Sequence, residues 1–360
     1  MNVLFFSSYS FPYISGMTMY TKRVISCLKK RGVHVAHLYF YPHSTSSSEE
    51  IPLPFAIHLF KGFISFRSPF IFWNAIKNQD VVCINYPNIE AIPLIICALL
   101  QRKKIVTIFH CSIQIKNPIL SVVLTPLLFF SLLVHFLAST SIISQEDYVS
   151  SFWWSTFFKN KYVYVDPPID IPEKTRKQTK KIPNSVGFVG RISSEKGIQY
   201  LISALSPLKE THLYFIGPSR VQGESGYKNK ILRLLEQNKI QYSFVSNPTD
   251  DELFEYITKL EMIVVPSINK TEAYGMVQPE AMVRGTPVIA TDLPGVRIPI
   301  KKTHMGLLVP TNDVKTLSRA IYKIHNELEI YSNKELVQKA MRLFDPTKSL
   351  NIIYETLSTI

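Results

Sequence analysis

Short apolar runs alternate with polar loops and amphipathic helical stretches along most of the chain. In the first half, this pattern predicts one helix at 18–31, which ends at Gly32, and another at 93–100. The apolar runs between them predict parallel strands joined by helical crossovers, as in βαβ units. The strands expected in this half are 3–6, 33–40, 81–85, 105–109 and 162–165.

The second half repeats the alternation from Ser185 onward. Its helices are recognised by capping residues and by glycine stops. They are expected at 198–205, from the cap at 249–252, from about Tyr274 to Gly285, and from Val314 onward. The strands expected here are 185–189, 212–216, 241–245, 262–266, 287–290 and 306–310.

A chain of 360 residues is too long for one typical core and predicts about two domains. Pro167, Pro168 and the basic run from Lys174 to Lys181 are typical of a linker. We therefore expect an α/β fold with two Rossmann-like domains. The expected boundaries are 1–165 for the N-terminal domain, 166–182 for the linker, 183–344 for the C-terminal domain, and 345–360 for a C-terminal helix that returns to the N-terminal domain.

Positive charge is concentrated in the first half. The net charge is +13, and residues 1–165 hold 14 Lys and Arg against 6 Asp and Glu, a balance of 14 − 6 = +8. Such a surface suits a polyanion, either nucleic acid or anionic lipid. Aromatic residues accompany the charge, and no nucleic-acid-binding motif is present, so an anionic membrane surface is the favoured partner. These aromatic residues are Phe63, Phe66, Phe70, Phe72 and Trp73.

One apolar stretch, 119–138, is long enough to cross a bilayer, and no Lys, Arg, Asp or Glu lies between Lys116 and Glu146. Pro126 and His135 count against a span. So does topology, since a crossing would separate one edge of the sheet from the rest. We expect a buried or membrane-facing helix here, with a transmembrane segment as the alternative.

The cysteines and the N-terminus carry no targeting or metal signal. The four cysteines form no CxxC pair and fall inside apolar patterns, so we expect buried thiols in place of a zinc site or disulfides. The first residues are interpreted as a strand and not as a signal peptide, because a basic leader and a cleavage site are missing.

Two carboxylates, Glu272 and Glu280, flank a turn that contains Gly275, just beyond the strand that stops at Pro266. In open α/β sheets, ligands bind at the carboxyl ends of strands. The two glutamates there are suited to hold hydroxyls while the backbone holds an anion. The alternative is a solvated Glu272 and a locally paired Glu280.

Two cations, Arg191 and Lys196, flank the loop after the strand at 185–189. An arginine fork and a mobile lysine charge suit a diphosphate, although a solvated loop pair is the usual explanation. The loop with the two glutamates lies on the same side of the same predicted sheet. Together the loops suggest a nucleotide ligand.

Gly16 and His110 are weaker candidates in the first half. Gly16 lies at a helix start, where it either lets a ligand approach the backbone or only completes a turn. His110 directly follows the strand at 105–109, so it faces the ligand side of the sheet, although a lone histidine is most often structural.

These segments together resemble the retaining, nucleotide-sugar-dependent glycosyltransferases of family 4, also called glycosyl transferases group 1. The resemblance covers most of the chain and implies the GT-B fold, with two Rossmann-like domains facing each other across a deep cleft. One departure is Ser15, which replaces the first of two adjacent glycines. The segments that carry the resemblance are Pro12-Tyr13-Ile14-Ser15-Gly16-Met17-Thr18, Lys30 to Val35, His110, Gly190-Arg191, Lys196-Gly197, Glu272 to Glu280, and Ala281 to Ala290.

The resemblance implies roles for individual residues. Glu280 would bind the ribose and Glu272 a donor-sugar hydroxyl, while Arg191 and Lys196 would neutralise the diphosphate. His110 would contact the donor sugar near its reacting carbon, so His110 and Glu272 are the expected catalytic pair. The expected donor-binding backbone is that of Gly16, Ala273, Tyr274, Gly275 and Met276. No metal and no other cofactor is expected.

The expected function is a hexosyltransferase that moves a hexose from a UDP- or GDP-sugar to a lipid-linked or surface-polysaccharide acceptor, such as lipopolysaccharide. Its expected location is cytoplasmic and peripheral, at the inner membrane face. The alternatives are a sugar-nucleotide epimerase of the same fold and a non-catalytic sugar-nucleotide-binding membrane partner. A Rossmann dehydrogenase is disfavoured, since no GxGxxG follows the first strand.

Overall fold

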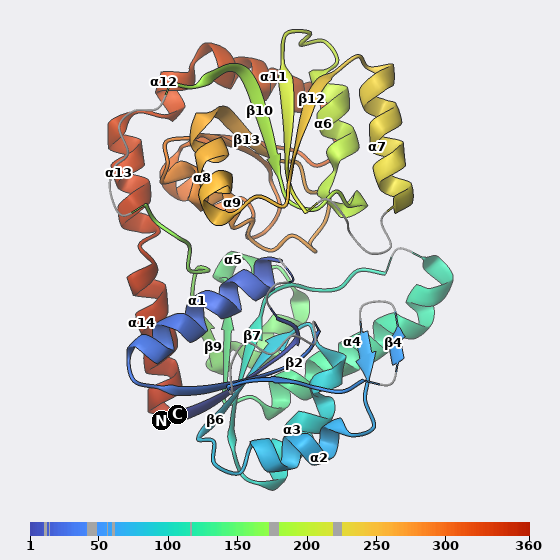
Figure 1. The fold of residues 1–360 in the computed structure, drawn as a ribbon, viewed down its shortest axis with the longest axis vertical. Helices are drawn as coiled ribbons and strands as arrows, with labels where there is room; N and C mark the ends of the chain where they lie inside the picture. The colour runs from blue at the N-terminus through green and yellow to red at the C-terminus, as the bar shows by residue number, and fades with distance from the viewer. Residues whose placement is uncertain are drawn as a thin grey trace. The chain divides into compact units, whose positions relative to one another are not determined.

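The structure is a computed structural model. It describes residues 1–10, 13, 15–41, 49–55, 57–59, 62–115, 117–172, 180–218 and 225–360. The chain divides into two compact units. Unit 1 comprises Met1–Pro168 and Thr347–Ile360, and unit 2 comprises Ile169–Pro346. Each unit has its own parallel sheet with helices on both faces, which confirms the predicted pair of Rossmann-like α/β folds (Figure 1). Pro12, Ile14 and most of the basic run at 174–181 lie outside the described residues.

Unit 1 has a seven-stranded sheet in the order β3-β2-β1-β6-β7-β8-β9, in which every neighbouring pair is parallel. A separate antiparallel hairpin consists of β4 and β5. The strands are β1 (Asn2–Tyr9), β2 (His34–Tyr41), β3 (Glu50–Pro52), β4 (Ile57–Leu59), β5 (Gly62–Ile64), β6 (Val81–Tyr86), β7 (Lys104–Phe109), β8 (Ser141–Ser144) and β9 (Tyr162–Tyr164).

The helices of unit 1 cover both faces of this sheet. Alternate residues of β1 enter opposite cores: Leu4 and Phe6 contact the cluster with α2 and α3, whereas Val3 and Phe5 contact the cluster with α1 and α14. Period-two burial on both faces is typical of a covered parallel strand. The helices are α1 (Gly16–Lys30), α2 (Ser68–Ala75), α3 (Ile92–Leu100), α4 (Pro118–Ala138), α5 (Glu146–Val149) and α14 (Pro346–Thr359), with 3₁₀ helices η1 (Ile89–Ala91) and η2 (Trp153–Lys161).

The C-terminal helix α14 belongs to unit 1. Its Ile353 and Leu357 are buried in the same cluster as Val3 and Phe5. The guanidinium of Arg31, just past α1, stacks over the Tyr354 ring at 4.9 Å. The last residues of the chain therefore complete the core that its first strand begins.

Unit 2 has a six-stranded parallel sheet in the order β12-β11-β10-β13-β14-β15. Its strands are β10 (Ile182–Val189), β11 (His212–Gly217), β12 (Gln241–Ser246), β13 (Leu260–Val265), β14 (Val288–Thr291) and β15 (Gly306–Val309). Its helices are η3 (Ser194–Lys196), α6 (Ile198–Leu205), α7 (Ser225–Gln237), α8 (Asp250–Lys259), α9 (Val277–Met282), α10 (Ile298–Thr303), α11 (Val314–Asn326), α12 (Leu328–Tyr331) and α13 (Lys334–Leu343).

The central strand of unit 2, β13, is buried along its whole length. Met262 and Val264 face the core shared with α6, α7 and α11, while Ile263 and Val265 face the core shared with α8, α9 and α13. Helix α8 begins at the predicted capping box, in which Thr249 and Glu252 exchange hydrogen bonds.

Several sequence predictions are corrected. The helix expected from about Tyr274 to Gly285 is only α9, Val277–Met282, because Gly275 has a φ of +73° and holds the residues before α9 in a turn. Helix α7 was not predicted. Phe63 and Phe72 are buried core residues and not surface aromatics, whereas Phe66, Phe70 and Trp73 are exposed. Cys83 and Cys97 are buried, but Cys27 and Cys111 are partly exposed.

Candidate functional site

The candidate site of unit 2 begins where β10 and β11 end together. Gly190 donates its N–H to the Ile216 carbonyl at 2.9 Å. A Cβ on Gly217 would lie 2.6 Å from the carbonyl oxygen of Gly190, so the two strand ends touch backbone to backbone. This contact leaves Arg191 at the carboxyl edge of the sheet.

A second close contact joins the loop after β10 to the loop after β13. Gly197 has a φ of +67°, and a Cβ there would lie 2.0 Å from the carbonyl oxygen of Pro266. Beside it, Ile268 donates its N–H to the Glu195 carbonyl at 3.0 Å. Only glycine fits this position, and its fit brings the two predicted ligand loops side by side.

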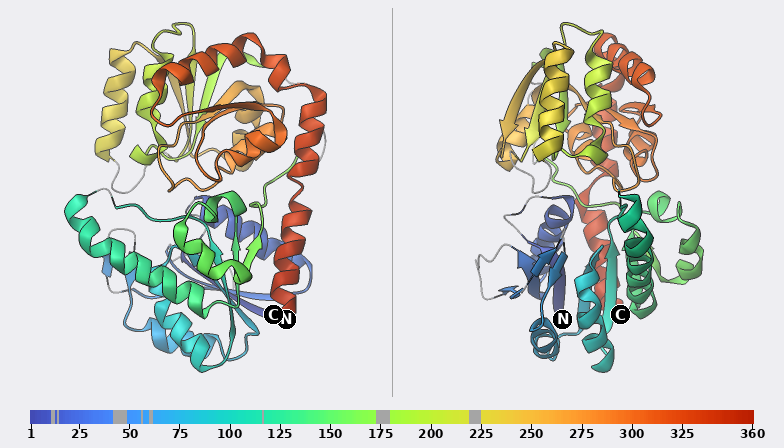
Figure 2. Two further views of the ribbon diagram at one scale, coloured as in Figure 1. Left: turned by 180° about the vertical axis from the view of Figure 1, so that it is seen from behind. Right: turned by 90° about the vertical axis from the view of Figure 1, so that its right-hand side faces the viewer.

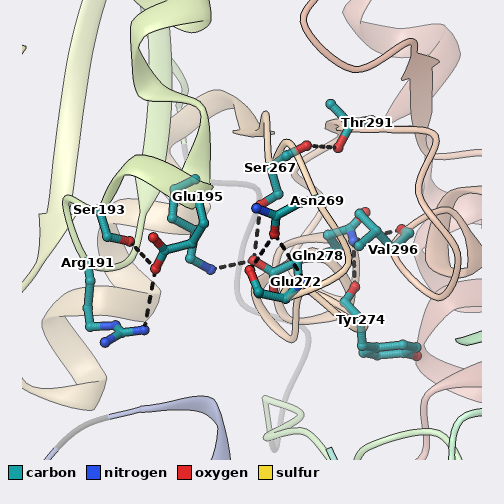
Figure 3. Close-up of polar contacts among 12 residues, drawn as sticks. Arg191, Ser193, Glu195, Ser267, Asn269, Glu272, Tyr274, Gln278, Thr291 and Val296 are labelled. Atoms are coloured by element: carbon teal, nitrogen blue, oxygen red, sulfur yellow. Dashed lines mark hydrogen bonds and ion pairs between the residues drawn. The ribbon is translucent and has the colours of Figure 1, made fainter. Parts of the chain in front are cut away.

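The contact between the loops places Lys196 against Glu272. The Lys196 ammonium forms an ion pair with the Glu272 carboxylate, and both side chains are partly buried. Ser267 donates its hydroxyl to the same carboxylate at 3.1 Å, and Thr291 in turn donates to the Ser267 carbonyl at 2.6 Å (Figure 3). The predicted diphosphate lysine and the predicted sugar glutamate therefore form one cluster.

Arg191 lies at the other end of this cluster. Its guanidinium is 3.9 Å from the carboxylate of Glu195, which also accepts a 2.7 Å hydrogen bond from the Ser193 hydroxyl (Figure 3). Glu195 and Ser267 were not predicted as site residues, although both stand in the two predicted ligand loops. They act on the predicted residues by orienting Arg191 and Glu272.

The turn from Ala273 to Met276 is held by the buried side chain of Gln278. The Gln278 amide nitrogen donates to the carbonyls of Tyr274 at 2.7 Å and Val296 at 2.9 Å (Figure 3). This amide joins the loop after β13 to the loop after β14. The sequence offered no distinct signal for Gln278, because a glutamine between two glutamates looks like an ordinary surface residue.

Glu280 is buried in α9, three residues after that helix begins. Its backbone carbonyl accepts a hydrogen bond from Arg284 at 2.9 Å, and Arg284 also donates to the Asp170 carbonyl at 3.0 Å. Arg284 stacks over the Phe254 ring at 3.6 Å. The helix turn that carries Glu280 is therefore tied to the first residues of unit 2.

Gly16 and His110 lie in unit 1. Gly16 is the first residue of α1, where Ser15 and Thr18 form a capping box, and a Cβ on Gly16 would meet nothing within 4 Å. As far as the described residues go, the space beside Gly16 is therefore open. Ser15, which departs from the usual glycine pair, has a structural role as the cap of α1.

His110 is held by its neighbours in a defined tautomer. Its Nε2 lies 2.7 Å from Asn85 Oδ1, while the Asn85 amide nitrogen donates to the Phe6 carbonyl at 3.3 Å. The Asn85 oxygen thus accepts, so Nε2 carries the proton and Nδ1 is left as an acceptor. Burial lowers the pKa of His110 to about 3, so the ring is neutral at physiological pH. Asn85 was not predicted as a site residue, although its place at the end of an apolar strand was a usable signal.

Two further buried histidines make unit 1 sensitive to acid. Burial lowers the pKa of both His37 and His135 to about 4, and nearby Lys29 adds to the effect at His37. The unfolded chain, with histidine pKa values near 6.5, binds more protons than the folded chain below neutral pH. Stability present above about pH 6.5 is therefore lost as the pH falls towards 4.

We expect each of these two histidines to cost about 1 kcal/mol of stability between pH 7 and pH 5.5. The measurement is the melting temperature across that range for wild type, His135→Gln and the exposed control His34→Gln. His135→Gln should flatten the pH dependence, whereas His34→Gln should keep the wild-type slope. If the melting temperature changes equally with pH in all three proteins, burial of neutral His135 is not a source of the acid sensitivity.

Among the described residues, no group of three or more His, Cys, Asp or Glu side chains is arranged to hold a metal ion. The described residues of unit 2 present side-chain cations and a carboxylate at the edge of its sheet. Arg191 and Lys196 suit an anion, and Glu272 suits hydroxyl groups.

Most of unit 2 matches a known protein family in sequence. Residues 170–340 match the family model described as "Glycosyl transferases group 1". D-inositol 3-phosphate glycosyltransferase of Corynebacterium jeikeium is 32% identical over 146 residues, which are 39% of this chain and 34% of that protein. The match thus spans about a third of the length of this curated relative.

Solved structures match the whole chain in fold. Alr3699/HepE of Anabaena, in complex with UDP-glucose, superposes with a TM-score of 0.77 at 16% identity and covers 100% of both chains. WaaG, a glycosyltransferase involved in lipopolysaccharide biosynthesis, has a TM-score of 0.70 at 18% identity and covers 98% of this chain and 99% of its own. These likenesses show a GT-B fold.

Proposed function

We propose that the whole chain is a glycosyl transferase of group 1, family 4, which transfers a hexose from a UDP- or GDP-sugar with retention of configuration. The observation that carries the proposal is the cluster of Lys196, Glu272 and Arg191 on adjoining loops at the carboxyl edge of the unit 2 sheet. The family match of residues 170–340 and the UDP-glucose complex of HepE support it. On this proposal the acceptor is a lipid-linked or surface glycan, and the likeness in fold to WaaG, a glycosyltransferase involved in lipopolysaccharide biosynthesis, supports it.

Each part of the candidate site meets one part of the donor. Glu280 binds the ribose hydroxyls, and the turn from Ala273 to Met276 lines the sugar and phosphates. Arg191 and Lys196 hold the diphosphate, on which negative charge grows as it leaves. Fixed cations at that position lower the barrier, and on this proposal they do so without a divalent ion.

The ion pair between Lys196 and Glu272 acts as a placeholder for the donor. Both groups are already oriented, by the contact at Gly197 and by the Ser267 hydroxyl. When the donor binds, Lys196 exchanges the carboxylate for a phosphate oxygen, and Glu272 exchanges the ammonium for a sugar hydroxyl. Each charged group thus keeps a partner, which limits the cost of desolvating it.

Retention follows from attack on the same face as departure. The acceptor oxygen forms its bond to the sugar carbon as the bond to the diphosphate oxygen breaks, and the hydroxyl proton passes to the leaving phosphate. His110, neutral and with Nε2 bound to Asn85, serves to contact the sugar and not to donate a proton. Gly16 offers an open backbone approach in unit 1.

We place this enzyme at the cytoplasmic face of the inner membrane, as a peripheral protein. The support is the +8 balance of residues 1–165 together with the exposed aromatic residues Phe66, Phe70 and Trp73. A basic surface with aromatic side chains suits an anionic leaflet.

The test is thermal unfolding with a panel of nucleotide sugars. We expect one UDP- or GDP-sugar to raise the melting temperature, since a ligand at 100 times its Kd adds about 2.7 kcal/mol. Glu280→Ala should lose most of this shift, while the exposed control Glu236→Ala on α7 should keep it. If no nucleotide sugar stabilises the wild type, the donor site is refuted. Conversion of the donor without any acceptor would instead indicate an epimerase.

A further inference from the structure

Helix α4 consists of two halves with different surroundings. The half from Leu128 onward is tied into unit 1: the Tyr86 hydroxyl donates to the Leu128 carbonyl at 3.3 Å, and the Lys161 ammonium donates to the carbonyls of Phe136 at 3.0 Å and Leu137 at 2.8 Å. Its buried side chains are Ser131, Leu132, His135 and Phe136. This half is part of the folded unit.

The half from Pro118 to Leu127 projects beyond the other elements of unit 1 (Figures 1 and 2). Its Ile119, Val122 and Val123 side chains are 80%, 74% and 70% exposed, and no residue in it is ionisable. A helix that faces water normally carries charged residues on that side. The projecting half therefore has a surface that suits hydrocarbon better than water.

Exposed aromatic residues lie at the base of the projecting half, and an exposed lysine follows them in η2. Trp153 of η2 lies 6.0 Å from the Phe129 ring and, like Phe157 and Phe130, is exposed. Lys159 on the same 3₁₀ helix is also exposed. Tryptophan at the interface and lysine at the headgroups are typical of the boundary of an anionic bilayer.

We propose that the N-terminal half of α4 inserts into one leaflet of an anionic bilayer, with η2 at the level of the headgroups. Ten residues at 1.5 Å each give a helix of about 15 Å, half of the roughly 30 Å hydrocarbon core. Because the other half is bonded to unit 1, the helix dips into the bilayer and does not cross it. The inference rests on the proposed function in one respect, since a lipid-linked acceptor is what makes this anchor useful.

The apolar length of α4 alone does not separate dipping from crossing. It is the one helix in the described part of the chain that is long and apolar enough to span a membrane. The hydrogen bonds of Tyr86 and Lys161 to its second half decide between the two, because a span would have to break both contacts and expose the core beneath.

The first test is flotation with vesicles of phosphatidylcholine containing 30% phosphatidylglycerol. We expect the wild type to float, and the double variant Val122→Asp/Val123→Asp to bind at least about tenfold more weakly, because two carboxylates would enter hydrocarbon. The matched control Tyr322→Asp/Ile330→Asp alters two exposed apolar residues of unit 2 and should bind like the wild type. Equal binding by both double variants would overturn the proposal.

The second test separates dipping from crossing. A membrane-impermeant maleimide is sealed inside the vesicles, and Asn117→Cys protein is added outside. Asn117 caps the projecting end of α4, so its thiol should stay unlabelled while the protein floats. Labelling from the lumen would show a crossing helix and overturn the proposal.

Donor binding distinguishes this inference from the proposed function. The variant Val122→Asp/Val123→Asp should keep the nucleotide-sugar shift in lipid-free buffer. If the wild type does not bind vesicles but its melting temperature still rises with the nucleotide sugar, only the membrane anchor is refuted. Vesicle binding without any donor shift refutes only the glycosyltransferase.

Discussion

Replacing Lys196 by alanine is expected to lower kcat for glycosyl transfer by about 10²–10³-fold, the usual effect of removing one fixed charge that stabilises a transition state. The variant removes the cation that, on the proposed mechanism, neutralises the leaving diphosphate, and it leaves Glu272 without its ion-pair partner. The measurement is the release of nucleoside diphosphate at saturating donor, in the presence of acceptor.

The fold should tolerate this change. The pair is partly exposed, so its loss is expected to cost no more than about 1 kcal/mol of stability. Lys259→Ala, which removes a surface pair with Glu255, is the matched control and should leave kcat unchanged. If the Lys196→Ala enzyme keeps the wild-type kcat, Lys196 has no role in the mechanism. If its melting temperature falls sharply, the role of Lys196 is structural.

Replacing Gly197 by alanine is expected to destabilise unit 2 by roughly 3–5 kcal/mol. The new Cβ would lie 2.0 Å from the Pro266 carbonyl oxygen and 2.8 Å from Ile268, at a φ of +67° that side chains disfavour. Because the nearest atom belongs to the backbone, the whole loop must move. At about 2–4 °C for each kcal/mol, the melting temperature should fall by about 6–20 °C.

Gly226 provides the matched control. It lies in α7, and a Cβ there would meet no atom of the described residues within 4 Å. Gly226→Ala should therefore stabilise the helix by about 0.5–1 kcal/mol. Any Gly197→Ala protein that still folds should also bind the nucleotide sugar less tightly, because the Lys196 and Glu272 loops are displaced. An unchanged melting temperature would show that the loop contact at Gly197 is not needed.

The sequence by itself determined the two parallel α/β units and the loops that carry the candidate site. Apolar runs, caps such as Thr249 to Glu252 and glycine stops are local signals, so strands such as β13 and helices such as α6 were predicted close to their observed bounds. Local pattern predicted helices wrongly where a turn preceded the helix or where its first turn contained a poor helix former. Gly275 shortened α9, and α7, with Gly226 in its first turn, was missed.

Only the tertiary structure decided which of these residues meet. Lys196 and Glu272 are 76 positions apart, and their ion pair depends on the glycine contact between Gly197 and Pro266. Both halves of α4 are apolar in sequence, yet one is bonded to unit 1 and the other projects from it. The apolar sequence of a segment indicates that it prefers a non-aqueous environment. Contacts between residues distant in sequence decide which part of the segment is buried in the protein and which part stays exposed.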